Sequence, residues 1–267
     1  MTFIRKIIPL MILGMICFPV LSVQAEEGSS KSGAELNNKA EMQLDQMARK
    51  LAGAKQFSVT MNMSYDVVQE SGQQIQFSEV RKVKISRPNH FRVDGQQSDG
   101  DTTGLVFDGK VLTLFHTTEN VYSQTEQTGD VNAALRYAIG KLGIRVPLAR
   151  LLVTTLPQEL KKLNMNVDYV EHNTLGDMPT DHIAIQAKDV DYQIWIRKDL
   201  LLARIVLTYK NEPGQPQFQA DFSDWNMTSA IKNSVFTYIP AKGAEKIKTL
   251  VPDRQSKVVS KVEGGEK

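Results

Sequence analysis

Cysteine is almost missing from this sequence: Cys17 is the one cysteine among 267 residues. It lies within an N-terminal segment that has the pattern of an export signal. A chain that loses this signal has no thiol, so it forms neither a disulfide nor a cysteine-ligated metal site. A chain of this length can bury a full core without such cross-links. Its stability must therefore come from packing and hydrogen bonds.

Motifs for catalysis and cofactor binding are missing as well. The sequence contains no HExxH, GxSxG, CxxC or phosphate-binding loop. Asp189 and Asp191 could hold a hard cation, but their position between two strands favours a role in a turn. The histidines show no paired ligand spacing, and they are His90, His116, His172 and His182. We therefore expect a non-enzymatic protein without cofactor or metal.

Neither sign of charge is in excess after export. The full chain has 32 Lys and Arg against 30 Asp and Glu, and Arg5 and Lys6 in the export signal account for the difference. Nucleic-acid binding depends on a basic surface that neutralises phosphates. A nucleic-acid partner is therefore not expected.

The N-terminus has the three parts of a secretory signal peptide. A basic pair (residues 5–6) precedes an apolar run (7–21), and small residues follow at positions 23 and 25. A retained membrane anchor is the alternative, but the apolar run is shorter than the ~20 residues that a spanning helix needs. Bulky Ile16 disfavours lipid attachment at Cys17. We predict export to the periplasm of a Gram-negative bacterium.

The remaining chain is expected to form one folded domain. The predicted segments are a cleaved signal peptide (1–25), a flexible leader (26–33), a single domain (34–247) and a disordered polar tail (248–267). We found no internal repeat and no second-domain boundary in the sequence. A monomer is expected.

The stretch 80–124 has the pattern of an antiparallel meander. Asp108 and Gly109 form a dipeptide typical of tight hairpins, because their backbone tolerates positive φ. Glu79 and Arg81 continue the parity of an apolar strand and are expected where that face meets water. The alternating apolar positions of a half-buried sheet are Val83, Ile85, Phe91, Val93, Leu105 and Phe107.

Helices are predicted at four places. Ser32 and Glu35 match a capping box before the apolar positions Ala40, Leu44, Met47 and Leu51, which recur at helical spacing. Asp130 is a candidate N-cap for a helix over 131–140, and two prolines can open short helices at 147–152 and 157–163. The helix that begins at Ser32 is expected either to cover a sheet or to act as a movable lid.

Further strands are predicted to Tyr238, which gives about eleven in all. Twist accumulates along a sheet of this size, so it should curl. The expected fold is α+β and mainly β, with a strongly curved, unclosed antiparallel half-barrel covered by helices. The predicted C-terminal strands are Met165–Val170, Asp181–Ala187, Val190–Arg197, Leu202–Lys210, Gln217–Asp224 and Val235–Tyr238.

Two sequence units resemble the LolA/LolB lipoprotein carriers. Arg87–Val93 and Phe107–Leu112 match their "RPxxFR … DGKxLW" pattern, apart from Thr113, which stands where the carriers often have Trp. The C-terminal half resembles an uncharacterised family of predicted periplasmic proteins in the same superfamily, through Asp189–Ile196, Ala203–Lys210, Pro216–Phe218, Asp224–Trp225 and Ala241–Ala244. The resemblance implies a curved barrel with an apolar cavity for acyl chains under helices. No motif places the carriers' lid-locking arginine.

Flexible and aromatic side chains on one face are candidates for such a cavity. They could equally fill an irregular core, because alternation is the same in both cases. Met42, Met47 and Met165 are further flexible candidates, and they too could line a cavity or fill the core. The cavity candidates are Phe57, Met61, Met63, Tyr65, Phe77, Phe91, Phe107, Leu114, Tyr169 and Trp195, and the lid-helix candidates are Leu44, Met47 and Leu51.

Two functions follow from this pattern. The first is a periplasmic protein that carries or senses a lipid or acylated lipoprotein in an apolar cavity. The alternative is a non-catalytic envelope-stress or assembly sensor, or a scaffold, that binds an inner- or outer-membrane protein through its convex face or edge strands.

Overall fold

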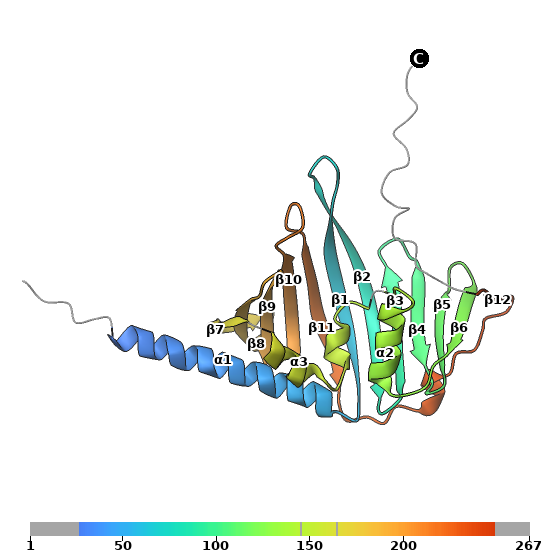
Figure 1. The fold of residues 1–267 in the computed structure, drawn as a ribbon, viewed down its shortest axis with the longest axis horizontal. Helices are drawn as coiled ribbons and strands as arrows, with labels where there is room; N and C mark the ends of the chain where they lie inside the picture. The colour runs from blue at the N-terminus through green and yellow to red at the C-terminus, as the bar shows by residue number, and fades with distance from the viewer. Residues whose placement is uncertain (1–26, 145, 164, 249–267) are drawn as a thin grey trace, which may run out of the picture.

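The computed structural model describes residues 27–144, 146–163 and 165–248. The predicted signal peptide and the polar tail after Lys248 lie outside the described residues. The described chain forms a twelve-stranded sheet with helices on one face (Figure 1). Its helices are α1 (Glu27–Gly53), α2 (Val131–Gly140) and α3 (Leu156–Lys162), with the 3-10 turns η1 (Ala149–Leu152) and η2 (Asn233–Phe236).

The sheet has the order β12-β6-β5-β4-β3-β2-β1-β11-β10-β9-β8-β7, and it leaves β12 and β7 as unpaired edges. All neighbours are antiparallel except β12, which runs parallel to β6. The strands are β1 (Gln56–Val68), β2 (Gln74–Ser86), β3 (His90–Gln97), β4 (Thr102–Phe107), β5 (Val111–His116), β6 (Val121–Glu126), β7 (Asn166–Leu175), β8 (Met178–Gln186), β9 (Val190–Arg197), β10 (Leu202–Tyr209), β11 (Gln217–Asn226) and β12 (Glu245–Lys246).

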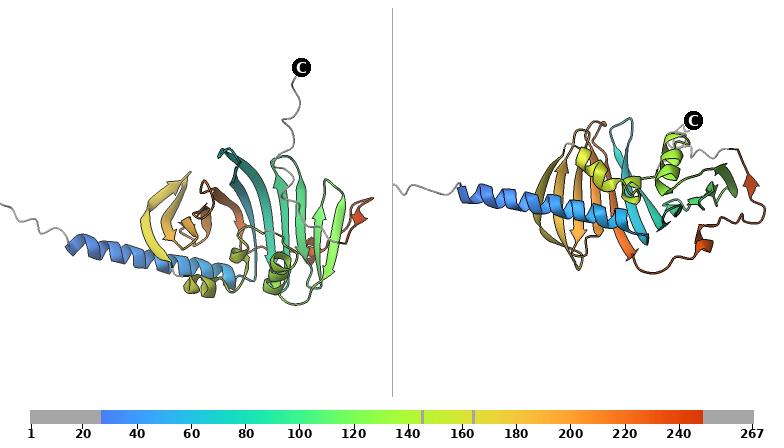
Figure 2. Two further views of the ribbon diagram at one scale, coloured as in Figure 1. Left: turned by 45° about the horizontal axis from the view of Figure 1, so that its top comes forward. Right: turned by 60° about the horizontal axis from the view of Figure 1, so that its bottom comes forward.

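The sheet bends around its helical side, as the two views of Figure 2 show. The helices lie over the lower part of the concave face, while the β1–β2 hairpin rises beyond them (Figure 1). This confirms the predicted strongly curved, unclosed half-barrel. Side-chain alternation explains why the helices cover one face of the sheet, because every second side chain of a strand points to that face.

The hairpin turn between β4 and β5 follows the predicted chemistry. Gly109 has a φ of 92°, and the Asp108 carboxylate accepts hydrogen bonds from the backbone N–H of Lys110 and Val111, at 2.9 and 2.7 Å. The turn sets the register in which Phe107 faces Leu112. Both side chains are buried in the core.

The predicted cap of α2 is also present. The Asp130 carboxylate accepts a hydrogen bond from the backbone N–H of Ala133, at 2.8 Å. Asn132, in the first turn, exchanges two hydrogen bonds with Thr154. These contacts attach α2 to the chain that follows η1.

Residues 233–236 form the 3-10 turn η2 instead of the predicted strand. The segment crosses the convex face, where the Arg92 guanidinium donates to the Val235 carbonyl oxygen at 3.2 Å. The Tyr238 ring stacks on Phe115, with centroids 4.8 Å apart. The sequence pattern suggested a strand because alternate apolar residues also suit a segment packed across a sheet. The twelfth strand is instead the short β12.

Close packing under this segment depends on Gly104 in β4. A Cβ atom at this position would lie 2.1 Å from the Phe115 ring, far inside contact distance. Phe115 can therefore lie over the backbone of β4 only because residue 104 has no side chain.

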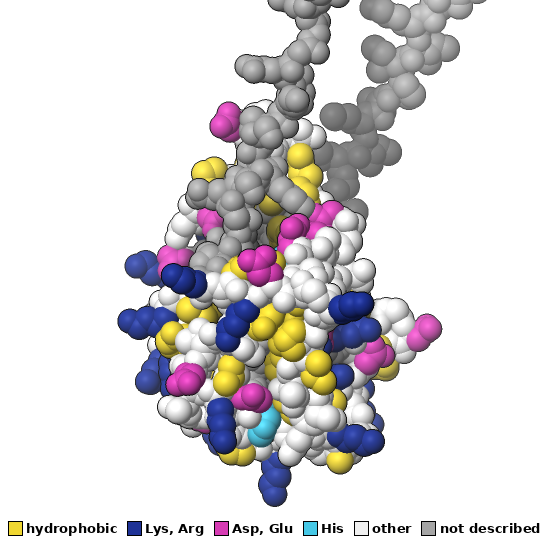
Figure 3. Space-filling model, turned by 90° about the vertical axis from the view of Figure 1, so that its right-hand side faces the viewer, with side chains coloured by type: hydrophobic (Ala, Val, Ile, Leu, Met, Phe, Trp, Pro, Cys, Tyr) yellow, Lys and Arg dark blue, Asp and Glu magenta, His cyan; other side chains and the backbone are white. Residues whose placement is uncertain are grey.

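On the face that contains β12 and its neighbours, acidic and basic side chains are interspersed with hydrophobic ones (Figure 3).

Helix α1 begins at Glu27, earlier than the predicted start at Ser32. It therefore extends into the segment predicted to be a flexible leader (26–33). The segment contains no proline, and each of its two glycines, Gly28 and Gly33, lowers helix stability by only about 1 kcal/mol. Propagation from the packed part of α1 can therefore extend through it.

Candidate functional site

The concave face contains a narrow apolar crevice. Strands β1, β2, β3 and β11 form its floor, and residues 146–152, here called the covering segment, form its roof. Its volume is about 10 Å³, close to the space that one water molecule needs. The crevice is lined by Phe57, Val59, Met61, Arg81, Val83, Val93, Val146, Pro147, Leu148, Leu151, Leu152, Phe222 and Trp225.

A bulge in β11 places Trp225 in this crevice. The pairing of β1 with β11 shifts between Ser58–Asn226 and Thr60–Ser223, and Asp224 has a φ of 53°. The extra residue re-aims the following side chain, as bulges do. The Trp225 indole N–H donates to the Leu202 carbonyl oxygen at 2.9 Å, which fixes the ring. The sequence predicted Asp224 as a strand end and missed this role of Trp225.

The covering segment has a strained backbone at one residue. Leu148 has a φ of 58°, a left-handed conformation that costs a residue with a Cβ roughly 1–2 kcal/mol. Its side chain lines the crevice. Strain of this kind persists only where neighbouring contacts hold it, and it is typical of segments that change conformation.

Arg87 fastens the covering segment to the sheet. Its guanidinium donates to the carbonyl oxygens of Ala54, directly after α1, and Leu152, at the end of η1, at 2.7 and 2.8 Å. The guanidinium carbon lies 5.7 Å from the centroid of the Phe57 ring. Burial lowers the pKa of Arg87 from its ordinary value. One side chain thus links two parts of the helical cover. The sequence marked Arg87 only as the first residue of the RPxxFR match and did not predict these bonds.

Glu79 and Arg81 are not where the sequence predicted them. Both are buried on the concave face of β2, with 8% of each residue exposed. They were expected at the water boundary because charged residues usually end an apolar face. Here each supplies the other's partner, since Arg81 Nε lies 2.6 Å from Glu79 Oε1. Arg81 is the one charged residue among those that line the crevice.

Eight of the ten cavity candidates are divided among three environments. Phe57 and Met61 line the crevice. Tyr65 and Phe77 stack above the helices, with centroids 6.0 Å apart, and Phe77 is 36% exposed. The candidates that are packed in the core away from the crevice are Met63, Phe91, Phe107 and Leu114.

Trp195 was predicted on the concave face, and the structure corrects this. Ile194 and Ile196 take the buried positions of β9, which turns Trp195 to the convex side. Its ring stacks on His182, with centroids 4.1 Å apart, and Arg204 lies over it at 5.9 Å. Burial lowers the pKa of His182.

The predicted lid helix is long and firmly packed. Leu44, Met47 and Leu51 are buried against the core, whereas Met42 is 55% exposed and is not part of a cavity wall. Contacts of α1 are with β7, α3 and η1. The roof of the crevice is therefore the covering segment, and α1 supports it from the side.

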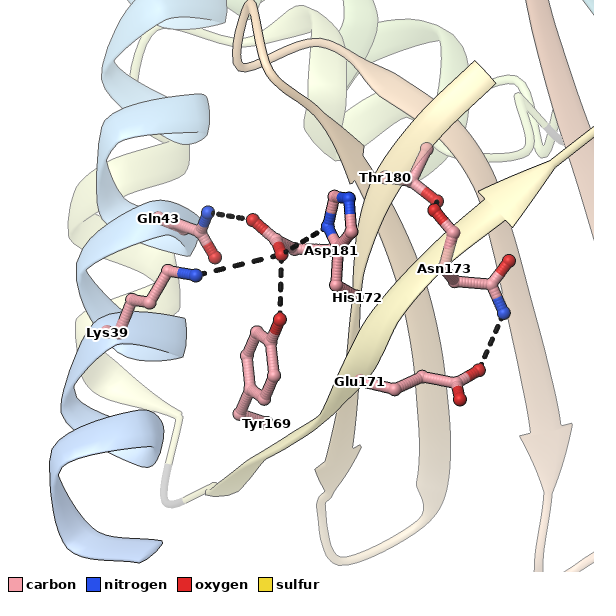
Figure 4. Close-up of polar contacts among 8 residues, drawn as sticks. All are labelled: Lys39, Gln43, Tyr169, Glu171, His172, Asn173, Thr180 and Asp181. Atoms are coloured by element: carbon pink, nitrogen blue, oxygen red, sulfur yellow. Dashed lines mark hydrogen bonds and ion pairs between the residues drawn. The ribbon is translucent and has the colours of Figure 1, made fainter. Parts of the chain in front are cut away.

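An anchor cluster of Lys39, Gln43, Tyr169, His172 and Asp181 holds α1 to strands β7 and β8 (Figure 4). Asp181 accepts hydrogen bonds from Gln43 at 2.5 Å and Tyr169 at 2.8 Å. His172 Nδ1 lies 3.2 Å from the same carboxylate. Tyr169 is thus part of a polar anchor and not of an apolar wall, because its hydroxyl needs a partner when partly buried.

The contacts of the anchor cluster change the pKa values of Asp181 and Tyr169. Burial by itself raises the pKa of Asp181, but hydrogen bonds from Gln43, Tyr169 and His172 and the charge of Lys39 together outweigh burial and lower it. Burial and the bond to Asp181 raise the pKa of Tyr169 to about 12. The carboxylate is therefore stabilised as an acceptor.

No group of three or more metal-ligating residues occurs within 27–144, 146–163 and 165–248. Within the same ranges, the helices are too short or too polar to cross a membrane.

The basic residues of β2 are separated by alternation, since Arg81 faces the crevice while Lys82 lies on the other side of the strand.

A curved, mainly antiparallel sheet that is open at both edges and covered by helices on its concave side is an unclosed half-barrel. The chain belongs to the family described as predicted periplasmic protein (DUF2092), whose model matches residues 40–250. It is a periplasmic protein of that family. The predicted resemblance to this family is confirmed.

Several solved structures are similar in fold. A crystal structure of MucB is 14% identical with a TM-score of 0.45, and the match covers 75% of this chain and 63% of MucB. A LolA superfamily protein from Nitrosomonas europaea is 10% identical with a TM-score of 0.36, over 74% of this chain and 97% of that protein. No curated protein matches the sequence.

Proposed function

We propose that this protein binds the acyl chain of a lipid or acylated lipoprotein on its concave face, as a carrier or a sensor. The observation that supports this most directly is the crevice between the sheet and the covering segment, lined almost wholly by apolar side chains. An acyl chain gains about 0.8 kcal/mol for each methylene that it buries there.

Binding requires the covering segment to move, because the closed crevice has room for about one water molecule. Movement of residues 146–152 breaks the bond between Arg87 and Leu152 and releases the strain at Leu148. The sheet beneath stays paired on both sides of β1. The ligand chain then replaces contacts that the covering segment makes in the closed state.

The apolar face continues above the helices, which gives a bound chain further surface. Phe77 and Ile75 are 36% and 38% exposed there. Tyr65, Leu207 and Tyr209 are half-buried beside them. Monomers usually bury such groups unless a ligand or a partner contacts them.

The two tryptophans allow a direct test, because Trp225 lines the crevice and Trp195 lies on the convex face. A Trp195→Phe protein reports on the crevice, and a Trp225→Phe protein reports on the convex face. Vesicles or micelles of a phospholipid with brominated acyl chains should quench the first protein and leave the second unquenched. Equal quenching, or none, would contradict the proposal.

Native mass spectrometry with lipid extraction provides a second test. The protein is purified from its own periplasm without detergent. A carrier should retain acylated molecules, and a protein that is free of them and ignores added lipid is evidence against this function.

A protein partner at the convex face is the second candidate function. The observation that favours it is the stack of His182, Trp195 and Arg204, which places aromatic and charged groups on an outer face. Tryptophan and arginine are typical of interface centres. Crosslinking in cells from position 195 should capture one membrane protein if the protein is a sensor or scaffold. A carrier captures many acylated cargoes from the crevice side instead.

A further inference from the structure

The ion pair of Glu79 and Arg81 lies beside the crevice. Arg81 Nε donates to Glu79 Oε1 at 2.6 Å, and Arg81 Nη2 lies 3.2 Å from Glu79 Oε2. This two-bond geometry holds the guanidinium in one orientation. Met61 and Val83, on either side, are both buried. A fixed guanidinium is therefore present in an otherwise apolar lining.

The strand opposite the pair leaves room for it. Gly95 in β3 is the pairing partner of Arg81. A Cβ atom at Gly95 would lie 2.7 Å from Glu79 Oε1, so a larger residue would push the carboxylate away from its position. Sequence alternation puts an apolar residue at the neighbouring positions, Phe91 and Val93. The glycine interrupts that apolar row where the ion pair lies.

Stability does not explain a buried ion pair well. Removing two charges from water costs several kcal/mol for each ion, and apolar residues of similar volume often give an equally stable or more stable protein. The position is also the one charged point on the crevice wall. A role in recognising a polar group of the ligand accounts for both facts.

We propose that Arg81, neutralised by Glu79, is a specificity-determining residue that donates hydrogen bonds to an uncharged ester or amide carbonyl of an acyl ligand. This inference rests on the proposed function. A guanidinium has five N–H donors, and Glu79 does not use them all. A carbonyl oxygen accepts from the remainder without adding charge.

A free carboxylate is excluded by the same geometry. A ligand carboxylate at Arg81 would bring a second negative charge close to Glu79 inside a low-dielectric region. Like charges at such distances repel strongly, and one of them must be protonated. The pair therefore selects acyl esters and amides against free fatty acids.

The test compares three probes with the same alkyl chain: a monoacylglycerol, the matching 1-O-alkyl glycerol ether and the free fatty acid. The first two differ in the ester carbonyl. Quenching or displacement at Trp225 measures binding at pH 8. Wild-type protein should bind the ester about tenfold more tightly than the ether, the effect of one good hydrogen bond. The fatty acid should bind more weakly than the ester.

Two variants complete the test. Glu79→Leu with Arg81→Met replaces both charges by apolar groups, and it should bind ester and ether equally while the ether affinity is unchanged. Glu79→Gln leaves Arg81 charged and should favour the fatty acid over the ester. Thermal unfolding of each variant verifies folding. If Glu79→Gln does not fold, the comparison of wild-type protein with the double variant is sufficient for the test.

The outcomes separate the two proposals. Wild-type protein that binds ester and ether equally overturns the role of Arg81 and leaves lipid binding in place. The same holds if the double variant keeps the preference for the ester. Wild-type protein that binds none of the three probes overturns the proposed function and this inference together.

Discussion

The guanidinium of Arg87 donates a hydrogen bond to the carbonyl oxygen of Leu152, 2.8 Å away, across 65 residues of sequence. A second bond, to Ala54 at 2.7 Å, connects the same side chain to the end of α1. These two hydrogen bonds join the end of β2, the end of α1 and the covering segment at one side chain. The proposed opening of the crevice therefore requires the bond between Arg87 and Leu152 to break.

Replacing Arg87 by Met should loosen the covering segment. The substitution removes two bonds from a charged donor and leaves two carbonyl oxygens without that partner, at a cost of about 2–4 kcal/mol. Hydrogen–deuterium exchange should increase in residues 146–152 while the strands of the sheet stay protected. Arg204→Met is the matched control, because Arg204 pairs with Asp221 on the other face. Equal exchange in both variants contradicts the assigned role of Arg87.

Replacing Asp181 by Asn should weaken the attachment of α1 and change the acid stability of the protein. The pKa of Asp181 is lower in the folded state, so its stabilisation is present above the ordinary aspartate pKa and is lost as the pH falls through the folded value. Wild-type stability should therefore decrease below about pH 4 more steeply than that of the Asn variant. Chemical unfolding at a series of pH values measures this, and parallel curves would refute it.

Tyr169 should titrate unusually late. Its pKa is raised to about 12 by burial and by the hydrogen bond to Asp181. The raised pKa means that its stabilisation is complete below the ordinary tyrosine pKa and is lost as the pH rises toward 12. The ultraviolet difference spectrum of wild-type protein should contain a late tyrosinate step that a Tyr169→Phe variant lacks. An unchanged titration in the variant assigns the late step to another tyrosine.

Gly104→Ala should destabilise the protein by about 1–3 kcal/mol, since the new methyl group collides with the Phe115 ring. The collision displaces the segment that crosses the convex face, so Tyr238 should lose its stacking contact. Gly53→Ala is the control, because no atom lies within 4 Å of a Cβ there. Denaturant unfolding compares the two, and equal midpoints contradict this account of the packing.

The sequence by itself determined most of the strands, the hairpin turns and the curvature class, because side-chain alternation and turn chemistry are local properties. Phe107, Asp108 and Gly109 illustrate this, since each occupies the predicted place. The same local rules gave the capping of α2 by Asp130.

Only the tertiary structure decided which of these residues form the site. Trp225 reaches the crevice through a bulge, Arg87 finds carbonyl partners far along the chain, and Glu79 and Arg81 share a buried position that Gly95 leaves open. Trp195 lies on the opposite face from the one expected. Such contacts depend on strand register and on pairs distant in sequence, and alternation along one strand does not encode them.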